Sequence, residues 1–412
     1  MAILPPLSAS SDRYRRISQH TGKATPKALA FPKIEPEDYD CREQTVAQKQ
    51  VIVVGGGIIG ASIAFHLVEA GAQVTLIEAG ELGGIVSPCS FGWTNASHKN
   101  TRPYFNLRFR SMHLWDDLAA RLPDIPYRRT EVLYLDGKSF DLDAFYANHT
   151  GWDYPLQWLD EAQIRELEPG LTVVPERGIL STAEGAVEAS PAAVFFAKQA
   201  EAKGARVITN TEVTRLVVEG DTVKGVVAGG ETLPADEVVI ASGNGTKALG
   251  AMAGVDVPMY SKPGLLISTT PVSHRVQRLI LAEAVHFRQR ADGTLSAGED
   301  FGGGEINDNP EAGSQMLLER IRNQLVDNTG IELAGYTVGH RPIPGDDHPI
   351  VGRPVDRSGL FIAVMHSGAT LAPVVGSATA RELLNDERDP LLATFGMDRF
   401  DGLQSTATVA AE

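Results

Sequence analysis

The clearest pattern of apolar positions in this chain begins at residue 51. Val51–Val54 form an all-apolar run, as expected for a strand that is buried on both faces. Apolar side chains then recur at helical spacing from residue 58 to 70, and Gly71 follows as a residue that can end the helix. Val74–Glu78 form a second apolar strand. This order predicts a strand, a helix and a strand packed as one βαβ unit.

Shorter blocks of strand and helix follow at two places farther along the chain. A helix is predicted from Pro191 to about Lys203, because proline favours the first helical turn and Gly204 can end the helix. Further strands are predicted at 206–209, 213–218, 223–228, 238–241 and 360–364, and a further helix at 372–384. These blocks are interpreted as parts of one nucleotide-binding domain that is interrupted by insertions.

The fold class predicted from these blocks is α/β, with a Rossmann-like domain interleaved with a second, α+β domain. The length of 412 residues supports two domains, because single compact domains stop growing at about 250 to 300 residues. The Rossmann-like domain is assigned residues 48–97, 179–254 and 341–395, and the second domain residues 98–178 and 255–340. Residues 1–47 are polar and lack a sustained period, so they are predicted to be an N-terminal extension, and residues 396–412 a C-terminal tail.

Charge and cysteine content narrow the partners and the compartment. The net charge of −15 argues against nucleic acid and anionic membranes, which repel an acidic protein. The apolar run Val51–Ile59 is too short to span a bilayer. With only Cys41 and Cys89, neither a disulfide framework nor a thiolate zinc site is expected, which favours a reducing compartment such as the cytoplasm. The basic residues before position 34 leave organelle targeting as the alternative.

A glycine-rich turn joins the first predicted strand to the helix. Gly55 permits the tight turn, Gly57 lets the backbone approach a pyrophosphate, and Gly60 allows the helix to pack closely on the strand. The anion would lie over the N–H groups at the helix start, beside Ile58 and Ile59. Glu78, followed by Ala79, ends the second strand, where a carboxylate accepts hydrogen bonds from ribose hydroxyls. The unit is therefore predicted to bind a dinucleotide.

The dinucleotide is predicted to be FAD rather than NAD. The nucleotide-binding blocks are scattered along the chain, whereas a nicotinamide enzyme usually has one contiguous domain. No second fingerprint follows a strand, since Gly243-Asn244-Gly245 lacks the third glycine at the required spacing. A single dinucleotide site implies that the substrate itself reduces the bound cofactor.

Several motifs resemble the family of FAD enzymes that contains D-amino acid oxidase, glycine oxidase and sarcosine oxidase. The resemblance covers most of residues 50 to 390. Besides the βαβ unit, it rests on Leu167-Glu168-Pro169-Gly170-Leu171, on Gly185-Ala186-Val187-Glu188, on Ala241-Ser242-Gly243, on the segment from Gly339 to Gly352 and on the segment from Phe361 to Pro373. It implies a two-domain flavoprotein of the glycine oxidase type.

The resemblance also implies which residues contact FAD. The segment from Ser87 to Asn95 would pass the flavin ring, Val213 would lie near the adenine, and a loop from His366 to Leu371 would contact the pyrimidine end of the ring. The residues implied are Ser87, Ser90, Phe91, Gly92, Val213, Ala241, Ser242, Gly243, Ser367, Gly368, Ala369, Thr370 and Leu371. Backbone N–H groups of that loop would stabilise negative charge on the reduced ring.

Three residues are candidates for work on the substrate. Arg341 matches the family arginine that binds a substrate carboxylate, for which a guanidinium fork is suited; a structural role is the alternative. His286 matches the position of an active-site tyrosine in glycine oxidase. His366, next to the flavin loop, could tune the ring or simply pack. No cluster of His, Asp or Glu has the spacing of metal ligands, so no metal is expected.

Two departures from the sarcosine oxidases limit what is carried over. Their lysine after the flavin loop and their oxygen-activating lysine are both absent here, so O2 and a quinone or other electron carrier both remain possible acceptors. The cysteine that tethers their flavin would fall near Gly339, so non-covalent FAD is expected, and Cys89 is interpreted as a small packing residue.

The function implied is oxidation of the C–N bond of a small amino acid or amine to an imine, by hydride transfer to flavin N5. One alternative is an FAD monooxygenase with a single Rossmann domain, because Gly345-Asp346-Asp347-His348-Pro349 superficially resembles a motif of that group. The other is a non-catalytic flavoprotein that serves as a binding or assembly module.

Overall fold

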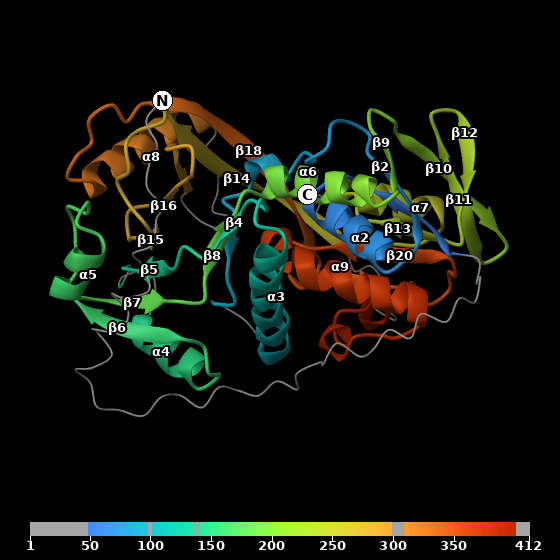
Figure 1. Cartoon of the computed structure of the whole chain (residues 1–412), viewed down its shortest axis with the longest axis horizontal. Coiled ribbons are helices and arrows are strands. Elements are labelled where there is room, and N and C mark those ends of the chain that lie inside the picture. Colours follow the sequence, from blue (N-terminus) through green and yellow to red (C-terminus); the bar gives the residue numbers. More distant parts are fainter. Residues whose placement is uncertain (1–47, 98–100, 136, 138–140, 299–308, 401–412) are drawn as a thin grey trace, which may run out of the picture. The chain divides into compact units, whose positions relative to one another are not determined.

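A six-stranded sheet organises the part of the chain that contains the βαβ unit (Figure 1). The computed structural model describes residues 48–97, 101–135, 137, 141–298 and 309–400, so the predicted extension 1–47 lies outside the described residues. The strand order is β19-β20-β13-β1-β2-β9, and all neighbours are parallel except β19 and β20. Their bounds are β1 Gln50–Val54, β2 Gln73–Ile77, β9 Arg206–Ile208, β13 Glu237–Ile240, β19 Ile350–Gly352 and β20 Leu360–Val364.

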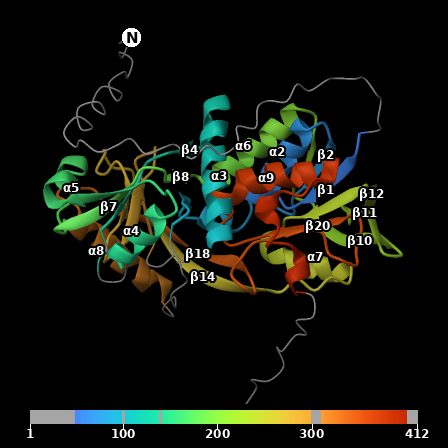
Figure 2. The same ribbon diagram turned by 90° about the horizontal axis from the view of Figure 1, so that it is seen from below.

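Successive residues of this sheet pack into two different cores. Val51 and Val53 face helices α2 (Ile58–Glu69), α6 (Ala189–Ala202) and α9 (Gly368–Asn385), which lie side by side in Figures 1 and 2. Ile52 and Val54 face the other way, toward α7 and a three-stranded sheet. That layer consists of β10 Val213–Glu219, β11 Thr222–Ala228, β12 Glu231–Pro234 and α7 Thr246–Met252. The all-apolar strand predicted from sequence is therefore buried on both faces, as expected.

Helix α2 approaches its neighbours at two glycines. A Cβ on Gly60 would lie 1.9 Å from the carbonyl oxygen of Gly55, so the helix could not rest this close to the end of β1 with any side chain there. A Cβ on Gly376 of α9 would lie 2.9 Å from the carbonyl oxygen of Ser62 on α2. The Gly60 contact is between backbones, and the Gly376 contact also involves the side chains of His66 and Ser62, at 2.5 and 2.6 Å, so both leave little room for adjustment.

Helix α9 begins four residues earlier than the sequence predicted, at Gly368 rather than Ala372. Pro373, which would be the second residue of the predicted helix, lies inside the observed one. Pro373 has no N–H for the carbonyl of Ala369, and Trp115 Nε1 donates to that oxygen instead at 3.0 Å. Likewise, helix α6 begins at Ala189 rather than Pro191.

Ser111 replaces the next backbone hydrogen bond of the same helix, between Thr370 and Val374. Its Oγ donates to the carbonyl of Thr370 at 2.6 Å and accepts from the N–H of Val374 at 3.3 Å, so a hydroxyl stands between two groups of the helix backbone. Both Ser111 and Trp115 belong to α3 (Arg102–Arg121) and are fully buried. The first turns of α9 are therefore held by a neighbouring helix.

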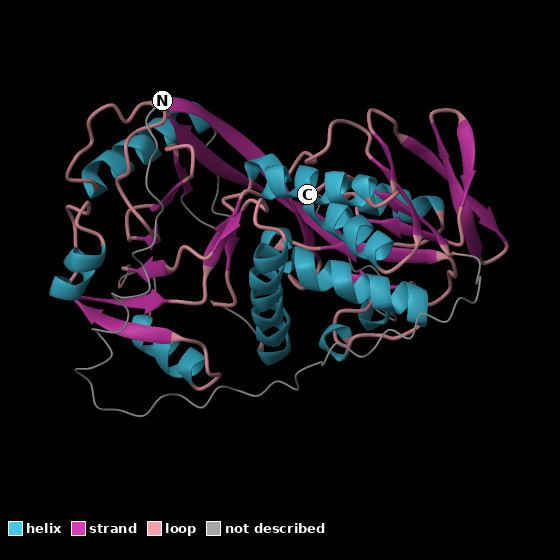
Figure 3. Cartoon of the chain, in the orientation of Figure 1, coloured by secondary structure: helices cyan, strands magenta, loops and turns pink. Residues whose placement is uncertain are grey.

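A second, eight-stranded sheet has the order β18-β14-β17-β16-β15-β5-β7-β6 (Figure 3). Its longest strands, β14 Met259–Thr269 and β18 Leu333–Pro344, pair antiparallel over their whole length. The other strands are β5 Val132–Tyr134, β6 Leu156–Asp160, β7 Arg177–Ser181, β15 Leu279–Leu281, β16 His286–Gln289 and β17 Leu295–Gly298. The domain boundaries predicted at 179 and 341 both fall inside strands of this sheet.

The remaining elements are short. A small sheet joins β3 Trp93–Thr94, β8 Gly185–Val187 and β4 Tyr127–Arg128, and helices α4 Leu142–Thr150, α5 Glu161–Leu167 and α8 Pro310–Gln324 accompany the eight-stranded sheet. The predicted tail begins in the described residues with a 3-10 turn, Met397–Phe400, whose Met397 is buried. None of the helices in the described ranges is long and apolar enough to cross a lipid bilayer.

The repair of α9 by Ser111 generates a stability prediction. Ser111→Ala removes a buried hydroxyl that serves two backbone groups, so the free energy of unfolding is expected to fall by about 1 to 3 kcal/mol. Ser377→Ala is the control, because Ser377 only donates back to the carbonyl of Val374 in the same helix, at 3.2 Å. Urea unfolding followed by fluorescence measures both; equal midpoints would contradict the role assigned to Ser111.

Candidate functional site

A cavity of about 410 Å³ lies at the carboxyl ends of the parallel strands. The last residues of β1, β2 and β20 (Val54, Ile77 and Val364) line it, together with Ala241, which directly follows β13. In the sheet, β1 lies between β2, which follows it in the sequence, and β13, which comes much later, so the strand order changes direction at β1. In open α/β sheets this change of direction is where ligands bind, because the connections diverge and leave a crevice.

Two helices present their N-termini to this cavity. Gly57, the N-cap of α2, and Gly368, the first residue of α9, both line it. Neither N-cap residue, Gly57 or Ser367, makes a side-chain hydrogen bond that caps its helix, and neither first turn contains an acidic residue. The N–H of Ile58 bonds to Ser87 Oγ at 3.3 Å, and a hydroxyl leaves the positive end of the helix dipole uncompensated. The cavity thus favours negative charge at two points.

Glu78 closes the glycine-rich turn from the other side. Its Oε2 accepts from the N–H of Gly56 at 2.6 Å and its Oε1 from the N–H of Gly80 at 2.9 Å. The carboxylate also lines the cavity. It therefore fixes the turn while leaving lone pairs for a hydroxyl donor.

Most of the residues predicted to contact FAD line this one cavity. Those are Gly55, Gly57, Ile58, Ile59, Glu78, Ala79, Ser87, Ser90, Val213, Ala241, Ser242, Gly243, Gly368 and Ala369, with His366 beside them. Segments that are more than 300 residues apart in sequence are thereby brought together, as Gly55 and Gly368 show. The fold therefore brings most of the predicted set to one cavity.

Other predicted residues do not line the cavity themselves but are close in sequence to residues that do. Gly60 packs against Gly55, while Leu371 and Thr370 are buried in α9 and Ser367 is its N-cap. Gly92 has a φ of +76°, and a Cβ there would lie 2.0 Å from the carbonyl oxygen of Val187. These residues shape the backbone of the wall.

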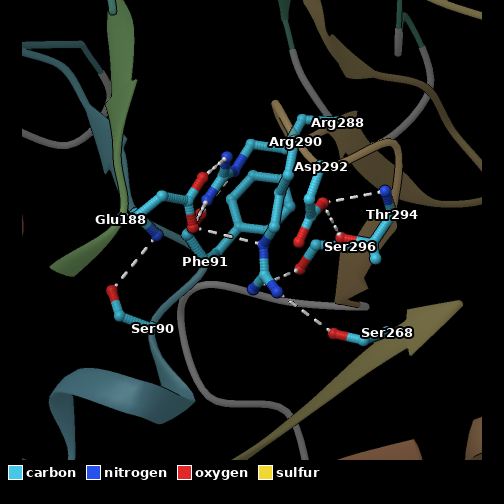
Figure 4. A network of polar contacts seen from close by, with 10 residues as sticks. Ser90, Phe91, Glu188, Ser268, Arg288, Arg290, Asp292, Thr294 and Ser296 are labelled. Carbon is cyan, nitrogen blue, oxygen red and sulfur yellow. Dashed lines mark hydrogen bonds and ion pairs between the residues drawn. The ribbon is translucent and has the colours of Figure 1, made fainter. Parts of the chain in front are cut away.

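Phe91 is held from behind by an ion-pair network (Figure 4). Its carbonyl accepts from Arg288 Nε at 2.8 Å, and Arg288 pairs with Glu188 at 2.5 Å. Arg290 pairs with the same carboxylate at 3.2 Å. A second cavity of about 350 Å³ adjoins this network and shares Ser87, Ser90 and Ala189 with the first. Arg288, which the sequence did not single out, and Glu188, which it noted only as part of a family motif, therefore support the segment from Ser87 to Gly92.

Arg341 lies on β18 at the edge of the cavity, which its neighbour Pro342 lines. The Arg341 guanidinium donates from Nη2 to the carbonyl of Pro263 at 2.8 Å and lies over Gly264, where an added Cβ would be 3.3 Å from its Nε. Asn244 holds the preceding residue by donating to the carbonyl of His340 at 2.7 Å. The strand pair thus places the Arg341 guanidinium next to the cavity lining.

His366 lines the cavity directly before α9. Burial lowers the pKa of its imidazole to about 4, and the nearby charges of Arg341 and Arg108 act in the same direction. The ring is therefore neutral at pH 7 and is a weak base. In contrast, His286 lies on β16, paired with Leu281 and Gly298, and it is not among the residues that line the cavity.

Sequence reasoning missed a further part of the lining. Gly84, Ile85 and Val86 precede Ser87 at the cavity, and Asn244 to Met252 contribute residues of η2 (Gly243–Gly245) and α7. The glycine pair Gly83-Gly84, in which both φ angles are positive, was the available signal for a turn near the ligand. Nothing in the sequence marked α7, because its periodicity is that of an ordinary short helix.

The lowered pKa of His366 predicts how stability depends on pH. The unfolded chain takes up a proton near pH 6.5, whereas the folded ring does so near pH 4, so native stability is lost as the pH falls through this window. At about 1.4 kcal/mol per pH unit, the loss from this group reaches about 3 kcal/mol at pH 4. His366→Gln should flatten the dependence of urea midpoints on pH between 6.5 and 4, while exposed His274→Gln should leave it unchanged.

Comparisons with known proteins assign the site to a family. The family described as FAD dependent oxidoreductase matches residues 50–382. Glycine oxidase from Bacillus licheniformis is 29% identical, covering 81% of this chain and 93% of that protein. The crystal structure of glycine oxidase from Geobacillus kaustophilus matches with a TM-score of 0.74 at 27% identity, covering 85% of this chain and 99% of that chain. L-amino acid deaminase from Proteus vulgaris, with its specific insertion sequence deleted, shares the fold with a TM-score of 0.78 at 22% identity, covering 86% of this chain and 94% of that chain.

These matches confirm the resemblance and the two-domain α/β flavoprotein fold that the motifs implied. Named oxidases are among the relatives along nearly their whole length, so the chain is an enzyme of the same general type. The chain belongs to the family of FAD-dependent oxidoreductases of the glycine and sarcosine oxidase type, and FAD is its cofactor.

Proposed function

We propose that this oxidoreductase converts the C–N bond of a small amino acid or amine to an imine, which water then hydrolyses. The observation that carries the proposal is the position of Arg341, which directly precedes Pro342 of the cavity lining and whose charge acts on His366 of the same lining. Relatives named glycine oxidase and sarcosine oxidase subunit beta support the substrate class.

The residues of the cavity fit FAD. The N-terminus of α2 suits a pyrophosphate, because Gly57 lines the cavity without a side chain and no acidic residue lies in the first turn. Glu78 would accept from ribose hydroxyls, and its charge disfavours a 2′-phosphate. When bound, FAD supplies a ring that accepts two electrons as a hydride. We propose that it is held without a covalent bond.

Arg341 is proposed to bind the substrate carboxylate. A guanidinium presents two parallel N–H donors to a carboxylate, which fixes the orientation of the substrate as well as its position. Orientation matters because a positioned reacting bond lowers the entropic part of the barrier. The bond from Arg341 to the carbonyl of Pro263 holds one side of the guanidinium in place.

The remaining chemistry requires only modest help from side chains. The substrate ammonium must lose a proton, and His366 is a poor acceptor because its pKa lies near 4. We therefore propose that another group accepts this proton: His286, a backbone carbonyl or solvent. The N–H groups at the start of α9 would donate to negative charge that develops next to them, which is stabilisation by fixed dipoles.

An anaerobic stopped-flow screen tests the proposed activity. Bleaching of the oxidised flavin absorbance by at least one small amino acid or amine is expected, followed by reoxidation on mixing with air or with a quinone, which identifies the acceptor. Reduction by NADPH alone would instead indicate a monooxygenase. If no amine or amino acid in a broad panel reduces the flavin, the proposed reaction is wrong, and a binding role for the flavoprotein would gain support.

The role of Arg341 predicts a defect in substrate binding. Arg341→Ala removes a charge-assisted contact of about 1.5 to 3 kcal/mol, so KM for the reducing amino acid should rise about ten- to hundredfold while FAD remains bound. Gly264→Ala should reproduce part of this effect by displacing the guanidinium. Gly335→Ala on β18 is the matched control, because an added Cβ there meets nothing within 4 Å. An unchanged KM in Arg341→Ala would exclude it as the carboxylate ligand.

A further inference from the structure

Glu184 is a fully buried carboxylate that the proposed chemistry does not use. It lies between β7 and β8 and is 0% exposed. Its oxygens accept from Trp93 Nε1 at 2.6 Å, from the Tyr134 hydroxyl at 2.7 Å and from the Tyr154 hydroxyl at 2.6 Å. None of these described donors is basic. Burying a carboxylate without a cation is costly unless several hydrogen bonds satisfy it, which indicates a specific role for the arrangement.

All three donors lead to one short segment, residues 93–97. Trp93 begins the segment, the Tyr154 hydroxyl accepts from the N–H of Ala96 at 3.2 Å, and the Tyr134 hydroxyl contacts Ser97 Oγ at 2.6 Å. Through these three side chains, Glu184 is linked to the segment at Trp93, at Ala96 and at Ser97. A carboxylate has enough lone pairs to accept from all three donors at once, which an amide of the same size has not.

The anchored segment contacts the helix that lines the FAD cavity. Thr370 Oγ1 donates to the carbonyl of Trp93 and accepts from the N–H of Asn95, both at 3.3 Å. Thr370 follows Gly368 and Ala369, which line the cavity at the start of α9. On its other side the segment continues directly from Ser87 and Ser90, which also line the cavity.

The segment has a separate anchor at its upstream end. There the carbonyl of Phe91 is held by Arg288, which is ion-paired with Glu188 (Figure 4). The two anchors differ in kind, because the upstream one joins opposite charges and the Glu184 anchor joins a carboxylate to hydroxyl and indole donors. Residues 93–97 are held by Glu184 through its three donors, and also by Arg108, which donates to Asn95 Oδ1 at 2.5 Å and to the carbonyl of Ser97 at 3.3 Å.

We propose that Glu184 is a positioning residue of the FAD site, which holds residues 93–97 and, through Thr370, sets the first turn of α9 against the cofactor. The inference rests on the proposed placement of FAD in the cavity and deepens it. Glu184 does not touch the reacting atoms; it acts through Trp93, Tyr134 and Tyr154.

Glu184→Gln in the full-length holoenzyme tests this role. The amide keeps the size but loses an acceptor and adds a donor that faces other donors. The dissociation constant of FAD is expected to rise about tenfold, the loss typical of one hydrogen bond to a charged group. The visible absorbance of bound flavin should shift, and kcat should fall while KM for the amine stays within about twofold, since Arg341 is unaffected.

Glu168→Gln is the matched control. Glu168 is equally buried, at 1% exposed, and accepts from the backbone N–H groups of Gln277 and Arg278 and from the Arg278 side chain. None of these partners belongs to residues 87–97. This variant should lose stability while keeping the FAD affinity and flavin spectrum of the wild type. Equal losses in both variants, or a wild-type spectrum and affinity in Glu184→Gln, would overturn the proposal.

Tyr154→Phe covers the case in which Glu184→Gln fails to fold. It removes only the hydroxyl that links Glu184 to Ala96, so an intermediate shift of the flavin spectrum and a few-fold weaker binding of FAD are expected. An unaltered flavin in this variant would count against the proposal. These readouts require no turnover, so a wild-type enzyme that oxidised no amine would refute the proposed reaction without deciding the role of Glu184.

Discussion

The close approach of backbone to backbone around helix α2 is the constraint on which the site depends. Gly60 rests against the carbonyl of Gly55, and Gly376 lets α9 approach Ser62 of the same helix. A helix that lies this near the end of β1 opens its N-terminus directly onto the crevice, and α9 follows it. Two positive helix ends therefore meet one cavity, where an anionic cofactor is stabilised by dipoles that are already in place.

Helix α9 can reach the cavity only because another helix completes its backbone hydrogen bonds. Pro373 costs α9 a donor in its second turn, and the oxygens left over are served by Trp115 and Ser111 of α3. A proline in this place would otherwise kink or end the helix. The position of the first turn is thus set by tertiary contacts, with Thr370 joined on one side to α3 and on the other to residues 93–97.

What the sequence predicted well was local or periodic. The βαβ unit follows from an apolar run, a helical period and glycines at fixed spacing, and each of these acts within about thirty residues. The predicted start of α9 was wrong, since the helix continues through Pro373. The side chain of Trp115, which takes the role of the missing N–H by donating to the carbonyls of Ala369 and Thr370, lies more than 250 positions away in the sequence. Glu184 was not noticed for a similar reason, since a buried carboxylate and a surface carboxylate look the same in one sequence until Tyr134 and Tyr154 are seen beside it.

Arg341 and His366 are electrostatically coupled at the cavity, because the charge of Arg341 acts on the imidazole of His366. The charge of Arg341 adds to burial in lowering the pKa of His366, and the charges of Arg108 and Lys262 act in the same direction, so the imidazole stays neutral beside these cations. A substrate carboxylate on Arg341 would neutralise the charge that acts on the ring, and part of the pKa depression would then be relieved. Occupancy by the substrate and the protonation of His366 are therefore thermodynamically linked, although burial, the larger cause, keeps the ring a weak base in both states.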